Sequence, residues 1–194
     1  MIKAIIFDFF GVLVTEGTTA FVEAFYPNIK AKIKQTDKYI DELNLGILSY
    51  EEYLDHLAEL GGAGREEVRA YLDTNKPNRP LLDYIKKELK SKYKLGVISN
   101  ASADWIYEIL DKTDIELFDD IVLSHSAGVI KPEPAIYELS LGNLKVRADE
   151  VVFIDDIEKY CEAARGVGMK SIRYENFKQA KADLNKILVS DSNN

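Results

Sequence analysis

Two short apolar runs in this chain end directly in carboxylates. AIIF at residues 4–7 leads into Asp8, and VVFI at residues 151–154 leads into Asp155 and Asp156. Unbroken runs of Val, Ile and Phe are typical of parallel strands that are buried on both faces. In open α/β sheets the ligand site lies at the carboxyl ends of such strands. The sequence therefore predicts three carboxylates at one sheet edge, where a divalent cation would offset their mutual repulsion.

Five strand-like runs occur along the chain, and helical patterns separate the last four. The strand-like runs are residues 3–7, 95–99, 120–124, 151–155 and 170–174, and the helical patterns are residues 80–93, 103–112, 134–141 and 159–167. Strands that alternate with helices indicate βαβ units with right-handed crossovers. We therefore predict an α/β fold, a Rossmann-like parallel sheet with the first strand at its centre and helices on both faces.

The long segment between the first two strands has helical patterns and no strand pattern. Ser49 and Glu52 form a capping box that begins a helix, and Gly61 with Gly62 ends that helix. We predict a core domain made of residues 1–15 and 77–194, with an α-helical cap domain inserted at residues 16–76. The linkers at residues 11–19 and 76–80 are predicted to act as hinges that let the cap close over a substrate.

Composition restricts the partners and the compartment. The net charge of −8 argues against nucleic acids and anionic membrane surfaces as partners. Cys161 is the single cysteine, so no internal disulfide can form and a cytoplasmic protein is expected. The chain has only two histidines, which argues against a histidine-rich metal site and against a Ser-His-Asp triad. The sequence is compatible with a monomer or a homodimer, and no apolar run approaches the roughly 20 residues of a membrane span.

Four polar motifs fall at the ends of the predicted strands or in the loops that follow them. They are DFFGVL at residues 8–13, VISN at 97–100, GVIKPEP at 128–134 and FIDD at 153–156. Each taken alone has a simple structural explanation, such as a helix cap or a solvated loop lysine. Together they supply a carboxylate nucleophile, a hydroxyl donor, a fixed cation and a metal site, which is the equipment for phosphoryl transfer through an aspartyl-phosphate.

In this order and spacing the motifs resemble the haloacid dehalogenase-like (HAD-like) hydrolase superfamily, most of whose members are phosphatases. The resemblance covers nearly the whole chain, including the helical cap inserted after the first strand. Residues 155–169 are similar in particular to the phosphatase domain of soluble epoxide hydrolases and to bacterial sugar-phosphate phosphatases. The resemblance implies a hydrolase that acts on a small phosphorylated metabolite with Mg²⁺ as its cofactor.

The resemblance also assigns the metal ligands. Asp8 would be both the nucleophile and a Mg²⁺ ligand, and its carboxylate is expected to be ionised at neutral pH. The backbone carbonyl of Phe10 and the carboxylate of Asp156 would bind the metal directly, and Asp155 would bind it directly or through water. Such a set of hard oxygen ligands, completed by water, is what Mg²⁺ requires.

The remaining motif residues are assigned to the phosphoryl group. Ser99 would donate a hydrogen bond to a phosphoryl oxygen, with Asn100 beside it as a second substrate-binding residue. Lys131 would neutralise the phosphoryl group and orient Asp8. The predicted catalytic residues are thus Asp8, Ser99 and Lys131, and the predicted substrate-binding residues are Ser99, Asn100 and Lys131.

Phe10 departs from the pattern that the resemblance implies. Phosphatases of this superfamily usually carry a second Asp at this position, which protonates the leaving group and then activates water, and loss of such a group costs about 10²–10⁴-fold in rate. Tyr160 also lies where related sequences often have Asn. Two alternatives to a phosphatase therefore stay open. One is a catalytically weakened phosphate- or phosphoprotein-binding module, and the other is a haloacid dehalogenase, which the paired Asp155 and Asp156 disfavour because dehalogenases work without a metal.

Overall fold

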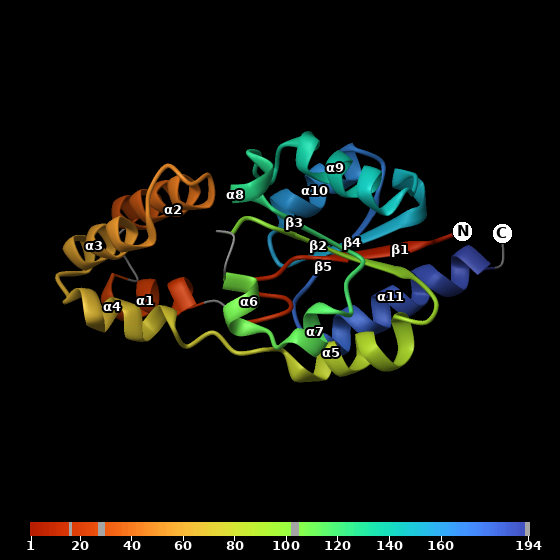
Figure 1. Ribbon diagram of the computed structural model, residues 1–194, viewed down its shortest axis with the longest axis horizontal. Coiled ribbons are helices and arrows are strands. Elements are labelled where there is room, and N and C mark those ends of the chain that lie inside the picture. The colour runs from red at the N-terminus through yellow and green to blue at the C-terminus, as the bar shows by residue number, and fades with distance from the viewer. Residues whose placement is uncertain (16, 27–29, 102–104, 193–194) are drawn as a thin grey trace.

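The computed structural model describes residues 1–15, 17–26, 30–101 and 105–192, and its centre is a five-stranded, fully parallel sheet (Figure 1). The strands are β1 (Ala4–Phe7), β2 (Lys94–Ser99), β3 (Asp120–Leu123), β4 (Val151–Asp155) and β5 (Lys170–Arg173). Their order is β3-β2-β1-β4-β5, and every pairing is parallel. The predicted α/β fold with the first strand at its centre is confirmed.

Helices cover both faces of the sheet, and four more helices lie beyond its carboxyl edge (Figure 1). Those of the core are α5 (Arg79–Tyr84), which continues as the π-helix η1 (Ile85–Leu89), α6 (Trp105–Ile109), α7 (Lys112–Ile115), α8 (Ser124–Ala127), α9 (Pro134–Leu144), the 3₁₀-helix η2 (Ala148–Glu150), α10 (Glu158–Gly166) and α11 (Phe177–Ser192). The remaining four are α1 (Gly17–Phe25), α2 (Lys30–Asn44), α3 (Tyr50–Gly61) and α4 (Arg65–Leu72).

The central strand shows why the sheet is covered on both sides. Side chains alternate between the two faces of a strand, so Ala4 and Ile6 pack with α9 and α10, whereas Ile5 and Phe7 pack with α5, η1 and α11. All four of these side chains are fully buried. An apolar residue is therefore required at every position of β1. Asp8 follows directly after β1, at the carboxyl end of this central strand.

The structure differs from the prediction at two helices. The helix expected at residues 103–112 ends earlier, because the side chain of Asp111 accepts a hydrogen bond from the Asp114 N–H at 3.0 Å and begins α7 as a separate helix; residues 103 and 104 lie outside the described residues. The helix α11 was not among the predicted helical patterns. Asp191 accepts a hydrogen bond from the Ile2 N–H and pairs with Lys170, which ties α11 to the sheet.

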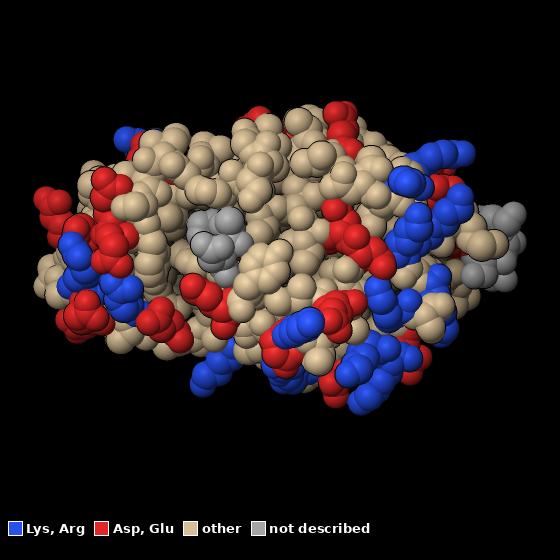
Figure 2. Space-filling model, viewed as in Figure 1, with Lys and Arg blue, Asp and Glu red and all other residues tan. Residues whose placement is uncertain are grey.

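The helices α1 to α4 have an apolar core of their own. It contains Phe21, Tyr26, Leu43, Tyr53, Leu54, Leu57, Val68 and Leu72. The capping box predicted at Ser49 and Glu52 is confirmed at the start of α3. Charged side chains of α3 and α4 are mixed on the outer surface, where Arg65 pairs with Asp55 and Arg69 with Glu51 (Figure 2). We propose that this unit is the cap domain, with the boundaries at residues 16–76 given above.

The two linkers between cap and core run side by side. The Thr15 N–H donates to the Lys76 carbonyl at 3.0 Å, and the Lys76 N–H donates to the Thr15 hydroxyl at 2.8 Å. Val14 and Pro77 form an antiparallel bridge, and the Asn78 N–H donates to the Leu13 carbonyl at 2.8 Å. The chain thus leaves and re-enters the core at one point, so the proposed hinges are mechanically coupled. No helix among the described residues is long and apolar enough to cross a membrane.

Candidate active site

The strand register brings the predicted carboxylates together. β1 and β4 are neighbours in which Phe7 is opposite Ile154, and the Asp8 N–H donates to the Ile154 carbonyl at 2.8 Å. One carboxylate oxygen from each of Asp8, Asp155 and Asp156 lies within 4.8 Å of the others. This convergence follows directly from the way the two apolar strands pair, because each strand ends at the same sheet edge.

Lys131 is buried among these carboxylates. Its side chain is 1 % exposed, and its Nζ lies 2.7 Å from Oδ1 of Asp8 and 2.6 Å from Oδ2 of Asp155. The ring of Tyr160 lies beneath it, with its centroid 4.8 Å from Nζ. The other oxygen of Asp155 accepts the Ile157 N–H at 2.8 Å. Asp155 therefore uses both oxygens within the protein, which fits a residue that fixes Lys131 and reaches a metal through water.

The charges at this edge are unbalanced without a further cation. Burial raises the pKa of Asp8 well above its ordinary value, and the charge of Asp155 raises it further, although Lys131 opposes both effects. Burial by itself lowers the pKa of Lys131, but the charges of Asp155 and Asp8 raise it above its ordinary value, so the ammonium stays charged. The ionisation of Asp8 at neutral pH stays a prediction, and nearby positive charge favours it. The three oxygen donors fit Mg²⁺, which would supply that charge.

Gly11 leaves the space in which Asp156 sits. Its φ of +80° is in the left-handed region, and a Cβ at this position would lie 2.3 Å from Oδ2 of Asp156. Only glycine combines this backbone conformation with such a close approach. The DFFG motif thus positions Asp156 as well as Asp8, a role for Gly11 that the sequence did not reveal.

We expect Gly11→Ala to weaken Mg²⁺ binding strongly, because the new methyl group would displace the Asp156 carboxylate. The matched control is Gly62→Ala, since Gly62 has a φ of +66° and open space around its Cβ position. Both variants carry a similar backbone cost, about 1–2 kcal/mol, and both should melt at a lower temperature. Calorimetric titration with Mg²⁺ should detect a loss only for Gly11→Ala, and equal affinities in the two variants would contradict the placement of the metal at Asp156.

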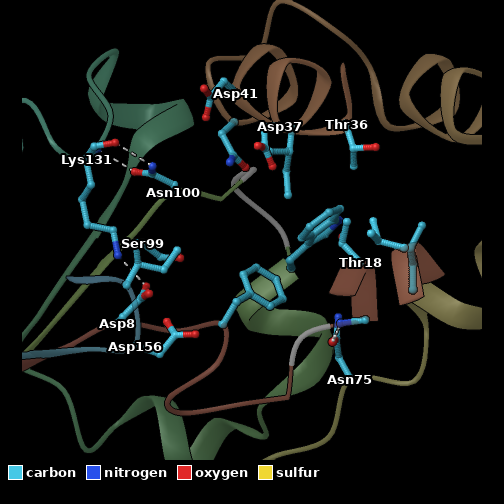
Figure 3. Close-up of a pocket in the computed structure, with 18 of the residues that line it drawn as sticks. Asp8, Thr18, Thr36, Asp37, Asp41, Asn75, Ser99, Asn100, Lys131 and Asp156 are labelled. Carbon is cyan, nitrogen blue, oxygen red and sulfur yellow. Dashed lines mark hydrogen bonds and ion pairs between the residues drawn. The ribbon is translucent and has the colours of Figure 1, made fainter. Parts of the chain in front are cut away.

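Ser99 presents an unsatisfied hydroxyl beside Asp8 (Figure 3). The residue is 1 % exposed, and its Oγ is buried with no hydrogen-bond partner among the described residues. Leaving such a group unpaired costs about 1–3 kcal/mol, and native proteins rarely do so without a reason. A phosphoryl oxygen bound in front of Asp8 would accept this hydrogen bond, as predicted for Ser99.

Asn100 contacts the backbone of Lys131. Its Nδ2 donates to the Lys131 carbonyl at 3.0 Å and to the Tyr160 hydroxyl at 3.3 Å, and its Oδ1 accepts the Lys131 N–H at 2.7 Å. Both amide hydrogens are thus used within the protein. The side chain of Asn100 therefore positions the lysine loop, and its assignment as a direct substrate ligand stays a prediction. The hydroxyl of Tyr160 completes this network.

Phe10 forms an aromatic wall instead of supplying a carboxylate. Its ring meets Phe9 edge-on at a centroid distance of 4.9 Å and Trp105 at 5.5 Å, and Trp105 in turn meets Tyr50 of α3 at 5.2 Å. These rings connect the loop after β1 to the cap. The role assigned to the Phe10 carbonyl as a metal ligand stays a prediction.

A cavity of about 1080 Å³ lies between this sheet edge and the cap. It is lined on the core side by Asp8, Phe10, Ser99, Asn100, Lys131, Asp156 and Tyr160, and on the cap side by residues that include Asp37, Asp41, Asn44, Tyr50 and Asp73. Asp37 and Asp41 project from α2 toward the core residues (Figure 3). The sequence did not identify these cap residues, although residues 33, 37, 40, 41 and 44 share one face of a helix of 3.6 residues per turn.

The cap is anchored beside this cavity by a buried hydroxyl. Ser124 is fully buried, and its Oγ donates to the Asn44 carbonyl at the end of α2 at 2.7 Å. The same oxygen accepts the Ala101 N–H at 3.1 Å, directly after the Ser99–Asn100 pair. The cap thus contacts the loop that follows Ser99 and Asn100.

The parallel sheet thus carries carboxylates, a buried lysine and an unpaired serine at its carboxyl edge, and the four helices α1 to α4 lie over them. The chain matches the family of haloacid dehalogenase-like hydrolases over residues 2–168. It therefore belongs to that family, as its motifs indicated.

Comparisons with individual proteins agree with this assignment. The chain is 29% identical to the D-ribitol-5-phosphate phosphatase of Bacteroides thetaiotaomicron over 98% of this chain and 100% of that protein. It is 33% identical to the bifunctional epoxide hydrolase 2 of Rattus norvegicus over 57% of this chain, but the match spans only 21% of that longer protein. A HAD family enzyme of B. thetaiotaomicron, crystallised with magnesium and inorganic phosphate, has the same fold, with a TM-score of 0.71, 23% identity and coverage of 93% of this chain and 99% of that one.

Proposed function

We propose that this protein is a Mg²⁺-dependent phosphatase that hydrolyses a small phosphomonoester through an aspartyl-phosphate on Asp8. The observation that carries the proposal is the arrangement around the Asp8 carboxylate. One of its oxygens is held by Lys131 and the Phe9 N–H, at 2.7 and 2.6 Å, and the other has no hydrogen bond from the described residues. The unpaired hydroxyl of Ser99 stands beside it. The relative that matches over its full length is named as a phosphatase of a sugar phosphate.

In the proposed reaction Oδ2 of Asp8 attacks phosphorus, and the bond from phosphorus to the ester oxygen breaks. Lys131 and Ser99 hold phosphoryl oxygens while negative charge shifts toward the leaving oxygen. Water then attacks the phosphorus of the aspartyl-phosphate, which releases inorganic phosphate and restores the Asp8 carboxylate. Bound Mg²⁺, held by Asp8 and Asp156, would neutralise charge on the phosphoryl group.

The alcohol leaves without help from residue 10. A phenyl ring can neither donate a proton to the departing oxygen nor take one from the attacking water, so solvent must do both. The protein is therefore expected to be a slow catalyst for esters of poorly acidic alcohols. The presence of Phe10 in place of a carboxylate also favours the second candidate function, a phosphate- or phosphoprotein-binding module that retains the fold and the metal site.

A panel of phosphomonoesters, assayed with Mg²⁺ and with a chelator, tests the proposal. We expect release of inorganic phosphate that requires Mg²⁺, with p-nitrophenyl phosphate hydrolysed faster than alkyl phosphates. Equal activity in chelator would contradict the metal assignment. Phosphate binding without any turnover would establish the binding module, and release of halide from 2-haloacids without metal would establish the dehalogenase.

A further inference from the structure

The cavity is much larger than a phosphate group requires. Cavities of about 300–1,000 Å³ accept ligands of drug size, and this one measures about 1080 Å³. The phosphoryl group would occupy only the end at Asp8, Ser99 and Lys131. The rest of the space belongs to the alcohol portion of the ester, so its lining determines which alcohols fit.

That lining is strongly acidic. Five carboxylates line the cavity away from the metal site, and they are Glu23, Asp37, Asp41, Asp73 and Glu108. Among the described lining residues, Lys159 is the single cation outside the phosphate site. The cap end therefore has an excess of negative charge toward the cavity, and a charged lining of one sign selects ligands of the opposite sign.

One buried polar side chain points to a ligand at this end. Asn44 is 4 % exposed and lines the cavity, yet its side-chain amide makes no hydrogen bond with the residues that the structure describes. It lies one helical turn after Asp41, on the face of α2 that Asp37 and Asp41 share. Both carboxylates project into the cavity from α2 (Figure 3). The three side chains thus offer acceptor oxygens to a group that donates hydrogen bonds.

The aromatic wall provides a second surface for a cation. Tyr50 and Trp105 line the cavity next to Phe10, and the faces of such rings attract ammonium groups. The ring of Tyr50 already accepts one cation, because the guanidinium carbon of Arg69 lies 5.6 Å from its centroid. Burial and the charge of Asp37 raise the pKa of Asp41, whereas the charge of Lys159 lowers it.

We propose that the phosphomonoester bound in this cavity carries an ammonium group on its alcohol portion, held by Asp37, Asp41 and Asn44 of α2 against the rings of Tyr50 and Trp105. This inference rests on the proposed function, whose phosphate site fixes the other end of the ligand. A hydroxyl would satisfy the hydrogen bonds but leave the carboxylates uncompensated. A carboxylate or second phosphate would meet like charges, which repel it from this end of the cavity.

The test uses alkyl phosphates that end in an ammonium, a hydroxyl or a carboxylate group, prepared over a homologous series of chain lengths. Their dissociation constants are measured by calorimetry with Mg²⁺ present, and their kcat/KM values are measured alongside. At the best chain length we expect the ammonium compound to bind at least about tenfold more tightly than the carboxylate compound. The preference should decline as salt is added, because the cap carboxylates are exposed to the cavity.

The double variant Asp37→Asn with Asp41→Asn should remove most of this preference. Asp83→Asn is the matched control, because Asp83 pairs with Lys87 on the surface of α5, away from the cavity. A hydroxyl or carboxylate compound that binds as tightly as the ammonium compound would overturn the inference and leave the phosphatase proposal intact. Binding in the expected order without turnover would instead contradict the phosphatase and retain the ammonium site. Failure of all three compounds to bind at any length would overturn both.

Discussion

The variant Asp8→Asn should lose turnover of every phosphomonoester, with a fall on the order of 10⁴-fold or more. An amide oxygen is a poor nucleophile, so no phosphoryl group can be transferred to residue 8. The substitution also removes one of the two carboxylates that hold the Lys131 ammonium, at 2.7 Å. Phosphate release from a panel of esters, followed together with the melting temperature, separates loss of chemistry from loss of folding.

Two further measurements serve as controls for the Asp8→Asn variant. Asp8→Asn should still bind inorganic phosphate, because Ser99 and Lys131 remain, and burial of an ionised carboxylate is no longer required. Brief incubation of the parent protein with substrate, followed by acid quenching, should trap phosphate on Asp8, and this adduct should be absent from the variant. Activity that survives the substitution would mean that the nucleophile is another residue.

The variant Phe10→Asp should gain activity toward alkyl phosphates. A carboxyl group at this position could protonate the departing alcohol, and the gain should approach about 100-fold, the lower end of the range for general acid catalysis. The full range is not expected, because the ring of Phe10 packs against Phe9 and Trp105, and a carboxylate is less stable among such rings. The measurement compares kcat/KM for alkyl phosphates in the two proteins.

p-Nitrophenyl phosphate is the internal control for that comparison. Its alcohol leaves readily as an anion, so Phe10→Asp should change its hydrolysis far less. The Asn side chain of Phe10→Asn is similar in size to Asp but has no acidic proton to transfer at neutral pH. This variant should therefore give no gain with either ester. An equal gain for both esters, or a gain in Phe10→Asn, would show that Phe10 limits the rate by its bulk.

The sequence predicted the sheet edge well, because short-range patterns determine it. Four apolar residues before Asp8 and four before Asp155 leave few alternatives to buried parallel strands, and the pairing of neighbouring strands then places both carboxylates together. The break before α7 escaped prediction because the capping oxygen of Asp111 decides it, against an otherwise continuous helical pattern. The two faces of α11 differ little in hydrophobicity, so its pattern is weak. Its contact with the sheet depends on the hydrogen bond from the Ile2 N–H to Asp191, a residue 189 positions later in the sequence.

The sequence identified which residues gather at the carboxyl edge of the sheet, but not how they are hydrogen-bonded to one another. Asn100 was assigned to the substrate because it follows Ser99, whereas its amide binds the loop of Lys131, 31 residues later. The carboxylates of α2 were not predicted as site residues, because charged residues on a helix are usually solvated. Only the position of the cap over the sheet edge turns Asp37 and Asp41 toward a cavity.

The paired linkers bear on how such an enzyme could change its specificity. Thr15 and Lys76 are hydrogen-bonded neighbours, so the ends of the inserted segment are already adjacent. The entropic cost of closing a loop grows only slowly with its length, and helical inserts of very different size could therefore be spliced between these two residues without straining the sheet. Exchange of the insert alone, by recombination or in the laboratory, would place a new cavity lining over the same carboxylates of the sheet.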